Sequence, residues 1–143
     1  MIRSVGVGMA LVLASLGCDA PERGSSEAAA NRILNGCDRA SAVDARQAAE
    51  VEIHFGDLQA YTYEPRCVRV RAGAKLRFTG DFLVHPLAPG RVVEGLPPAH
   101  ADNPIQETNV GLEKHFVAST RGSFGYYCNV HLAEGMMGAV FVE

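Results

Sequence analysis

The sequence lacks several features that would assign it to common functional classes. It has no run of Lys or Arg, and its 13 basic side chains are outnumbered by 16 acidic ones. Nucleic-acid binding depends on a basic surface that displaces counterions from phosphates, so this class of function is not expected. The motif Cys-x-x-Cys-His is absent, which excludes covalent attachment of a c-type haem. No internal repeat is evident, so a repeat architecture is not expected either.

The residues that are present fit one globular domain. The chain has 143 residues, of which 48% are hydrophobic and 20% are charged, and its formal net charge is -3 at pH 7. Five His, four Cys and four Met have the most distinctive chemistry. Their positions are more informative than the bulk composition.

The N-terminus has the pattern of a secretory signal peptide. Arg3 is followed by an apolar stretch at 5–16, which is shorter than the roughly 20 residues that cross a bilayer. Residues 14–18 resemble a bacterial lipoprotein cleavage site, at which Cys18 would become the acylated first residue. We expect a signal peptide at 1–17, a lipidated Cys18 with a flexible tether at 18–35, and a domain at 36–143, held at a membrane in the periplasm or cell envelope. Plain secretion after a different cleavage is the alternative.

Three cysteines remain if Cys18 is lipidated, and in an oxidising compartment two of them are expected to pair. Cys67 lies in an alternating stretch and shares parity with Arg69, so it is expected to face outward, where an N-terminal segment can cross the strand. Cys37 belongs to such a segment. We therefore predict a Cys37–Cys67 disulfide, with two unrelated thiols as the alternative, and Cys128 as the free cysteine.

Soft metal-binding side chains are concentrated near the C-terminus. Cys128, His131 and Met136 offer a thiolate, an imidazole and a thioether within one short segment. Sulfur donors prefer copper or zinc over magnesium or calcium, and imidazole suits copper, zinc, iron or nickel. His85 follows an apolar run and precedes a Pro-rich loop, where a sheet protein can present a fourth ligand. Two His and one Cys with a distant Met form the ligand set of a blue-copper centre.

Less specific interpretations apply to these residues taken singly. A lone Cys or Met is usually core packing, and a Cys-His pair can be a nucleophilic dyad, but neither explains the joint spacing with Gly135 and Gly138. Met137 competes with Met136 for the axial position, and the spacing favours Met136. The remaining candidates, which we expect to be exposed rather than metal ligands, are His54, His100 and His115.

Residues 37–143 resemble the cupredoxins of the plastocyanin and azurin kind. The most specific match is the spacing from Tyr127 through Cys128, His131 and Met136 to Gly138, which is similar to the plastocyanin metal loop. The resemblance implies one type 1 copper ion that alternates between Cu(I) and Cu(II). Its implied ligands are His85, Cys128, His131 and Met136, while the predicted disulfide is more similar to the azurin branch.

One position departs from that family. Cupredoxins commonly have Asn directly after the first His ligand, and its backbone N–H reaches the Cys sulfur while its side chain ties the ligand loops together. Here the residue is Pro86, which has no N–H to donate. Pro86 and Asn129, which follow the ligands His85 and Cys128, are expected next to the metal, where they would influence the reduction potential.

The spacing of apolar runs predicts an all-β fold, a Greek-key sandwich or barrel of the cupredoxin type with about seven or eight short strands. The long interval 86–113 has no clear period and has room for one short helix. The expected strands are 51–55, 58–63, 67–72, 74–79, 81–85, 114–119, 124–128 and 138–142.

The resemblance implies a monomeric one-electron carrier that docks transiently with redox proteins, and not an enzyme. Electrons would pass through His131, with Leu132, Leu87 and Pro89 as its neighbours in an apolar surface patch. A copper-delivery or copper-resistance protein with the same ligands is the alternative. Multicopper oxidases and nitrite reductases would need additional His clusters, and a binuclear copper centre would need a second Cys in the metal loop.

Overall fold

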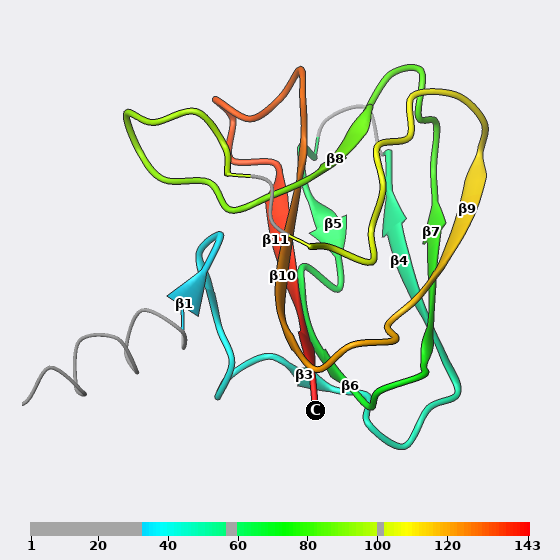
Figure 1. Cartoon of the computed structure of the whole chain (residues 1–143). Helices are drawn as coiled ribbons and strands as arrows, with labels where there is room; N and C mark the ends of the chain where they lie inside the picture. Colours follow the sequence, from blue (N-terminus) through cyan, green and yellow to red (C-terminus); the bar gives the residue numbers. More distant parts are fainter. Residues whose placement is uncertain (1–32, 57–59, 100–101) are drawn as a thin grey trace, which may run out of the picture.

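A computed structural model describes residues 33–56, 60–99 and 102–143. In this part of the chain every regular element is a β-strand, and the strands form two facing sheets and one small hairpin (Figure 1). Within the same residues, no helix could cross a membrane. The predicted all-β sandwich is confirmed.

One sheet contains both strands that the metal loop connects. In spatial order its strands are β3 (Val43–Asp44), β6 (Cys67–Val70), β11 (Met137–Val142), β10 (Gly122–Cys128) and β8 (Leu87–Pro89). Strands β8, β10 and β11 pair antiparallel, and β11, β6 and β3 pair parallel.

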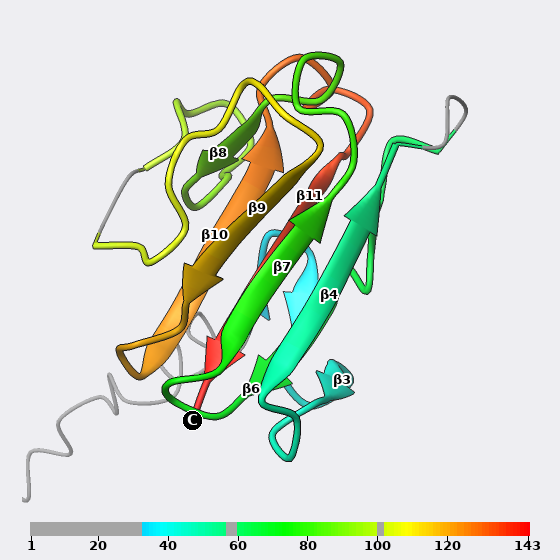
Figure 2. The ribbon, with the colours of Figure 1, turned by 90° about the vertical axis from the view of Figure 1, so that its right-hand side faces the viewer.

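The second sheet lies against the first (Figure 2). Its spatial order is β5 (Tyr63–Glu64), β4 (Glu50–Phe55), β7 (Lys75–Thr79) and β9 (Glu113–Val117). Strand β4 shows why these residues form strands, because Val51, Ile53 and Phe55 are buried while the residues between them are exposed. This alternation places one face of the sheet in the core and the other in solvent.

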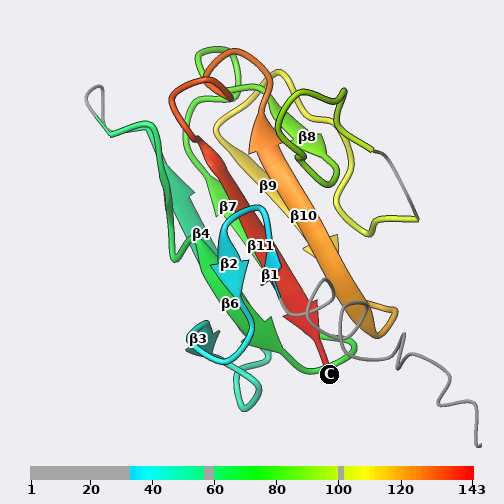
Figure 3. The same cartoon turned by 90° about the vertical axis from the view of Figure 1, so that its left-hand side faces the viewer.

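The outer face of the first sheet is covered by a hairpin of β1 (Ile33–Leu34) and β2 (Cys37–Asp38) (Figure 3). Leu34 and Cys37 pack there against Ala139 and Phe141 of β11 in a second, smaller apolar cluster. Strand β11 is therefore buried on both faces. The predicted boundary between tether and domain, at residue 36, falls inside this hairpin. The signal peptide at 1–17 and Cys18 lie outside the described residues.

Six of the expected strands are found within a few residues of their predicted bounds: 51–55, 67–72, 74–79, 114–119, 124–128 and 138–142. The expected strand 58–63 is reduced to β5, and 57–59 lie outside the described residues. The expected strand 81–85 is wrong. This segment is a turn in which the Asp81 carboxylate accepts from the Leu83 N–H and the Asp81 carbonyl accepts from the His85 N–H.

The interval 86–113 also differs from expectation. At its described positions it contains no helix. It contributes β8 and pairs with itself through isolated bridges at Leu87–Thr108 and Arg91–Ala99. Because this segment covers one end of the first sheet, Tyr127 is buried as well as Tyr126.

Candidate metal centre

The loop between β10 and β11 folds tightly back on itself. The Cys128 N–H donates to the Met136 carbonyl at 2.9 Å, and the Met136 N–H donates to the His131 carbonyl at 3.1 Å. Gly135 adopts φ 83°, a left-handed conformation in which a residue with a Cβ is strained. These bonds hold Cys128, His131 and Met136 in one compact loop at the end of the sandwich (Figure 1).

A second loop brings His85 to the same end of the molecule. The turn at Asp81 presents His85 directly before Pro86, and Phe82 anchors the loop in the core with no exposed surface. The Asn129 N–H donates to the Pro86 carbonyl at 3.0 Å, which joins this loop to the metal loop. Pro86 has no N–H for the sulfur, and the backbone N–H groups of Val130 and His131 donate to the Cys128 thiol instead.

The donor atoms of three side chains converge between these loops. Nδ1 of His85 lies 3.0 Å from Nδ1 of His131, and Sγ of Cys128 lies 3.5 Å from the same His131 nitrogen. All three donor atoms lie within 4.8 Å of one another, and they form the one such group of metal-binding side chains found among the described residues. His85 and Cys128 are buried, and His131 is half-buried.

Burial shifts the pKa values of His85 and Cys128. It lowers the pKa of His85, and the nearby His131 lowers it further while Asp81 opposes the shift. Burial also raises the pKa of the Cys128 thiol, although the two backbone N–H donors act against this. Both shifts favour the neutral forms in the absence of metal. A bound cation would therefore displace the thiol proton, because thiolate is the form that binds metal.

The donor set fits copper. Two imidazole nitrogens and one cysteine sulfur form a compact trio, and Met136 is fully buried in the same core cluster as Cys128. Met137 lies outside that cluster and is half-buried at the start of β11. Hard cations such as magnesium and calcium prefer oxygen ligands, whereas this trio with a thioether suits copper.

Tyr61 is a neighbour of this site that the sequence did not indicate. Its ring stacks on the His131 imidazole, with centroids 4.4 Å apart and an interplanar angle of 21°, and it approaches His85 edge-on at 6.4 Å. The ring remains 42% exposed. No local pattern marks Tyr61, because its partner His131 lies in a loop far along the chain.

The surface around His131 is apolar, but not as predicted. Leu87 is fully buried in β8, so its expected place in a surface patch is wrong. Leu132 and Pro89 are half-buried. The exposed apolar side chains that flank the two metal-site loops are Leu83, Val84 and Val130, with exposed fractions of 75%, 43% and 59%.

The other histidines have separate surroundings. His54 is exposed on β4 beside the Thr79 hydroxyl, and His115 is exposed on β9 within 2.9 Å of Glu113. Both lie on the outer face of the second sheet, as expected. His100 lies outside the described residues.

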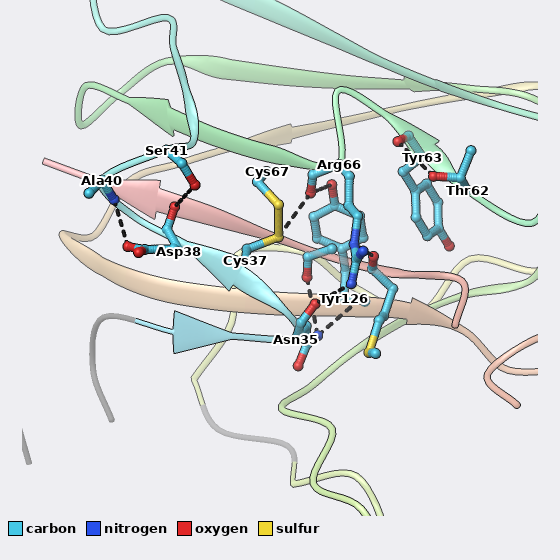
Figure 4. The surroundings of a disulfide bond; sticks show 12 residues. Asn35, Cys37, Asp38, Ala40, Ser41, Thr62, Tyr63, Arg66, Cys67 and Tyr126 are labelled. Atoms are coloured by element: carbon cyan, nitrogen blue, oxygen red, sulfur yellow. Dashed lines mark hydrogen bonds between the residues drawn. A yellow bond between two sulfur atoms is a disulfide. The ribbon is translucent and has the colours of Figure 1, made fainter. Parts of the chain in front are cut away.

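The predicted disulfide between Cys37 and Cys67 is confirmed (Figure 4). It joins the hairpin strand β2 to β6, and their Cα atoms are 5.5 Å apart. Cys128 is the free cysteine of the described residues and is buried. Among the described residues, the unpaired thiol is therefore that of Cys128, which lies beside His85 and His131.

No family model matches the chain, but individual proteins of known sequence or structure resemble it. Plastocyanin of Prochlorothrix hollandica is 30% identical over 102 residues, which cover 67% of this chain and 75% of that protein. Pseudoazurin from Methylobacterium extorquens AM1 is 24% identical over 65% of this chain and 74% of its own, with a TM-score of 0.45. Auracyanin from Roseiflexus castenholzii is 20% identical over 67% of this chain and 98% of its own, with a TM-score of 0.44.

Proposed function

Because the chain belongs to the plastocyanin family, a branch of the cupredoxins, we propose that it is a carrier of single electrons with one mononuclear copper ion. The expected ligands are His85, Cys128, His131 and Met136. The observation that carries this proposal is the convergence of two imidazole nitrogens and one thiol sulfur within 4.8 Å at the end of the sandwich. When bound, copper would supply a redox couple of Cu(I) and Cu(II).

The role of the protein is to keep the donor atoms in place during electron transfer. Three backbone hydrogen bonds fix the site: Cys128 to Met136, Met136 to His131, and Asn129 to Pro86. Burial of His85, Cys128 and Met136 excludes water from the site. A rigid, dry site reorganises little when the charge on the metal changes, and electron transfer is faster for that reason.

His131 is the route by which electrons reach the surface. Of the three converging side chains it is the most exposed, and Val130 and Leu132 flank it in the chain. Leu83 and Val84 extend the apolar surface from the neighbouring loop. An apolar patch of this kind suits brief docking with redox proteins over a small interface.

The burial of the ligands favours a carrier over a copper-delivery protein. Delivery requires rapid exchange of the metal with a partner, whereas here only His131 has appreciable exposure among the four expected ligands. We therefore expect electron self-exchange between reduced and oxidised protein to be faster than transfer of copper to a chelator. Copper transfer that outpaces self-exchange would favour the delivery function.

We further propose that the domain works in the cell envelope, tethered through a lipid on Cys18. The Cys37–Cys67 disulfide supports this location, because structural disulfides persist mainly in oxidising compartments. Mass spectrometry of protein extracted from a producing bacterium tests the anchor. An acylated N-terminal Cys18, lost in the Cys18→Ser variant, is the expected result, and an unmodified N-terminus at another position would contradict it.

Copper loading tests the function itself. Purified protein titrated with Cu(II) should bind one ion and become intensely coloured through the Cys128 sulfur, and reductant should bleach the colour reversibly. Cys128→Ser should remove the colour. A folded wild-type protein that binds no copper, or binds it without colour, would refute the proposal.

A further inference from the structure

Asn35 stands at the tip of the β1–β2 hairpin, yet its side chain is buried. Asn35 and Gly36 have φ values of 49° and 71°, the two positive angles of a tight Asn-Gly hairpin turn. Hairpin tips normally lie in water, but Asn35 is only 4% exposed. A buried amide requires hydrogen-bond partners, because an unpaired polar group in the interior is strongly destabilising.

The Asn35 amide makes four hydrogen bonds. Its nitrogen lies 3.0, 3.1 and 3.1 Å from the carbonyl oxygens of Gly90, Tyr126 and Gly138, so its two N–H groups serve three acceptors and one of them is shared. Its oxygen accepts from the Val92 N–H at 2.8 Å. Figure 4 shows Asn35 directed from the hairpin toward Tyr126 and the strands beneath it. One side chain thus joins three separate segments of the chain.

Each of these segments also carries an expected metal ligand. Gly90 follows His85 and β8 in the chain. Tyr126 lies on β10 and precedes Cys128, while Gly138 lies on β11 and follows Met136.

Arg66 reinforces this arrangement. Its Nε donates to the Met137 carbonyl at 2.9 Å, next to Met136, and its terminal nitrogen donates to the Asn35 carbonyl at 2.9 Å. The Arg66 carbonyl in turn accepts from the Tyr126 hydroxyl at 3.0 Å. The disulfide links the hairpin covalently to the segment of Arg66, because Cys37 lies just after the hairpin turn and Cys67 directly follows Arg66.

Two glycines leave the space that this contact needs. A Cβ at Gly125 would lie 2.3 Å from the Gly90 carbonyl oxygen and 2.6 Å from the Asn35 amide nitrogen. A Cβ at Gly138 would lie 2.4 Å from the Arg66 carbonyl oxygen. A larger residue at Gly125 would displace the Asn35 amide, and one at Gly138 would displace the Arg66 carbonyl and the Tyr126 ring.

We propose that Asn35 is a positioning residue for the metal centre, fixing from the outer face of the sheet the spacing of the segments that carry His85, Cys128 and Met136. This inference rests on the proposed copper function. At the metal end, the loops of His85 and Cys128 are joined through the Asn129 N–H and the Pro86 carbonyl, and Pro86 has no N–H to add another bond. The Asn35 amide joins the same segments through its hydrogen bonds on the outer face of the sheet.

The test removes the amide and keeps the hairpin turn. In Asn35→Gly the residue still tolerates positive φ, so the turn can form while all four side-chain hydrogen bonds are lost. Ile33→Gly is the matched control, because Ile33 is 57% exposed on the same hairpin and its replacement loosens the backbone without removing any hydrogen bond of the Asn35 side chain. Each protein is measured for copper release to excess chelator, for its visible spectrum, and, metal-free, for hydrogen exchange at the Cys128 amide.

In Asn35→Gly we expect copper release to be about tenfold faster, the lower end of the range for residues that orient metal ligands. The visible bands should shift, and exchange at the Cys128 amide should accelerate, while Ile33→Gly leaves all three unchanged. The proposal is overturned if Asn35→Gly loses only stability, or if both variants change equally. If Asn35→Gly does not fold, Arg66→Met, which removes the side-chain bonds to the Met137 and Asn35 carbonyls, decides on the same criteria.

The experiment separates this inference from the proposed function. A wild-type protein that binds no copper would refute the copper function, while hydrogen exchange in the metal-free proteins would still show whether Asn35 holds the Cys128 segment. A wild-type protein that binds copper normally, with no change in Asn35→Gly, would refute the positioning role alone.

Discussion

The Nδ1 atoms of His85 and His131 lie 3.0 Å apart, although the two residues are separated by 46 positions in the sequence. Two neutral imidazoles can share one hydrogen at this distance, but they can also direct both nitrogen lone pairs at a cation between them. Cys128 stands beside the pair at 3.5 Å from His131. Folding therefore brings together donors that can hold a metal with little further movement.

The disulfide should make a large contribution to stability. In the chain-entropy model, a bridge between residues 30 apart contributes roughly 3 to 4 kcal/mol. We expect the Cys37→Ser, Cys67→Ser double variant to lose about this amount in urea unfolding. The wild-type protein unfolded with and without dithiothreitol provides a control, because reduction should reproduce the loss. A double variant as stable as the wild type would contradict the prediction.

Replacement of Pro86 by Asn should change the reduction potential. The new residue has the backbone N–H that proline lacks, and by the resemblance to cupredoxins this N–H would reach the Cys128 sulfur. Hydrogen bonds to a metal-bound sulfur tune the reduction potential of the site. Spectroelectrochemistry of Pro86→Asn and the wild type measures the difference. Pro86→Ala is the control, since it restores the N–H without a polar side chain and should reproduce the change. An unchanged potential in both variants would show that the missing N–H is irrelevant.

The stacking of Tyr61 on His131 should stabilise the fold around the site. Aromatic pairs contribute about 0.5 to 1.5 kcal/mol beyond area burial, and the partial exposure of Tyr61 places it at the lower end. Tyr61→Ala should lower the free energy of unfolding of the metal-free protein by at least about 0.5 kcal/mol. Tyr61→Phe keeps the ring and should retain most of the stability. Equal losses in both variants would assign the effect to the hydroxyl instead.

A charge beside His131 should slow electron self-exchange. In Val130→Lys two like charges would meet whenever two copies dock through this patch, and such a juxtaposition is unfavourable by several kcal/mol, so we expect at least about a tenfold slower rate at low salt. Val117→Lys is the matched control, because Val117 is 51% exposed at the far end of β9, against 59% for Val130. Equal rates in the two variants would place the docking surface elsewhere.

Much of the metal loop could be predicted from the sequence because its ligands are local. Cys128, His131 and Met136 lie on one loop, so their spacing is visible without the fold. The contributions of Asn35, Arg66 and Tyr61 could not be predicted in this way. Each of them acts across pairings between distant segments, and a single Asn-Gly turn does not reveal what its side chain meets.

The errors at 81–85 and at Leu87 have separate physical reasons. The apolar run Phe82 to Val84 has the composition of a strand, but the Asp81 carboxylate and carbonyl capture backbone N–H groups and make it a turn. Leu87 lies in the next segment, which joins the first sheet as β8 and is buried there. Composition indicated apolar residues near His85 correctly, but it did not indicate which of them face solvent.

Electron paramagnetic resonance of the copper-loaded protein tests the central claim most directly. Strong delocalisation of the unpaired electron onto the Cys128 sulfur should give a spectrum with unusually small copper hyperfine splitting, and Cys128→Ser should convert it to the wide splitting of an ordinary copper site. A wild-type spectrum with wide splitting, unchanged by Cys128→Ser, would show that copper binds without this sulfur and would contradict the account.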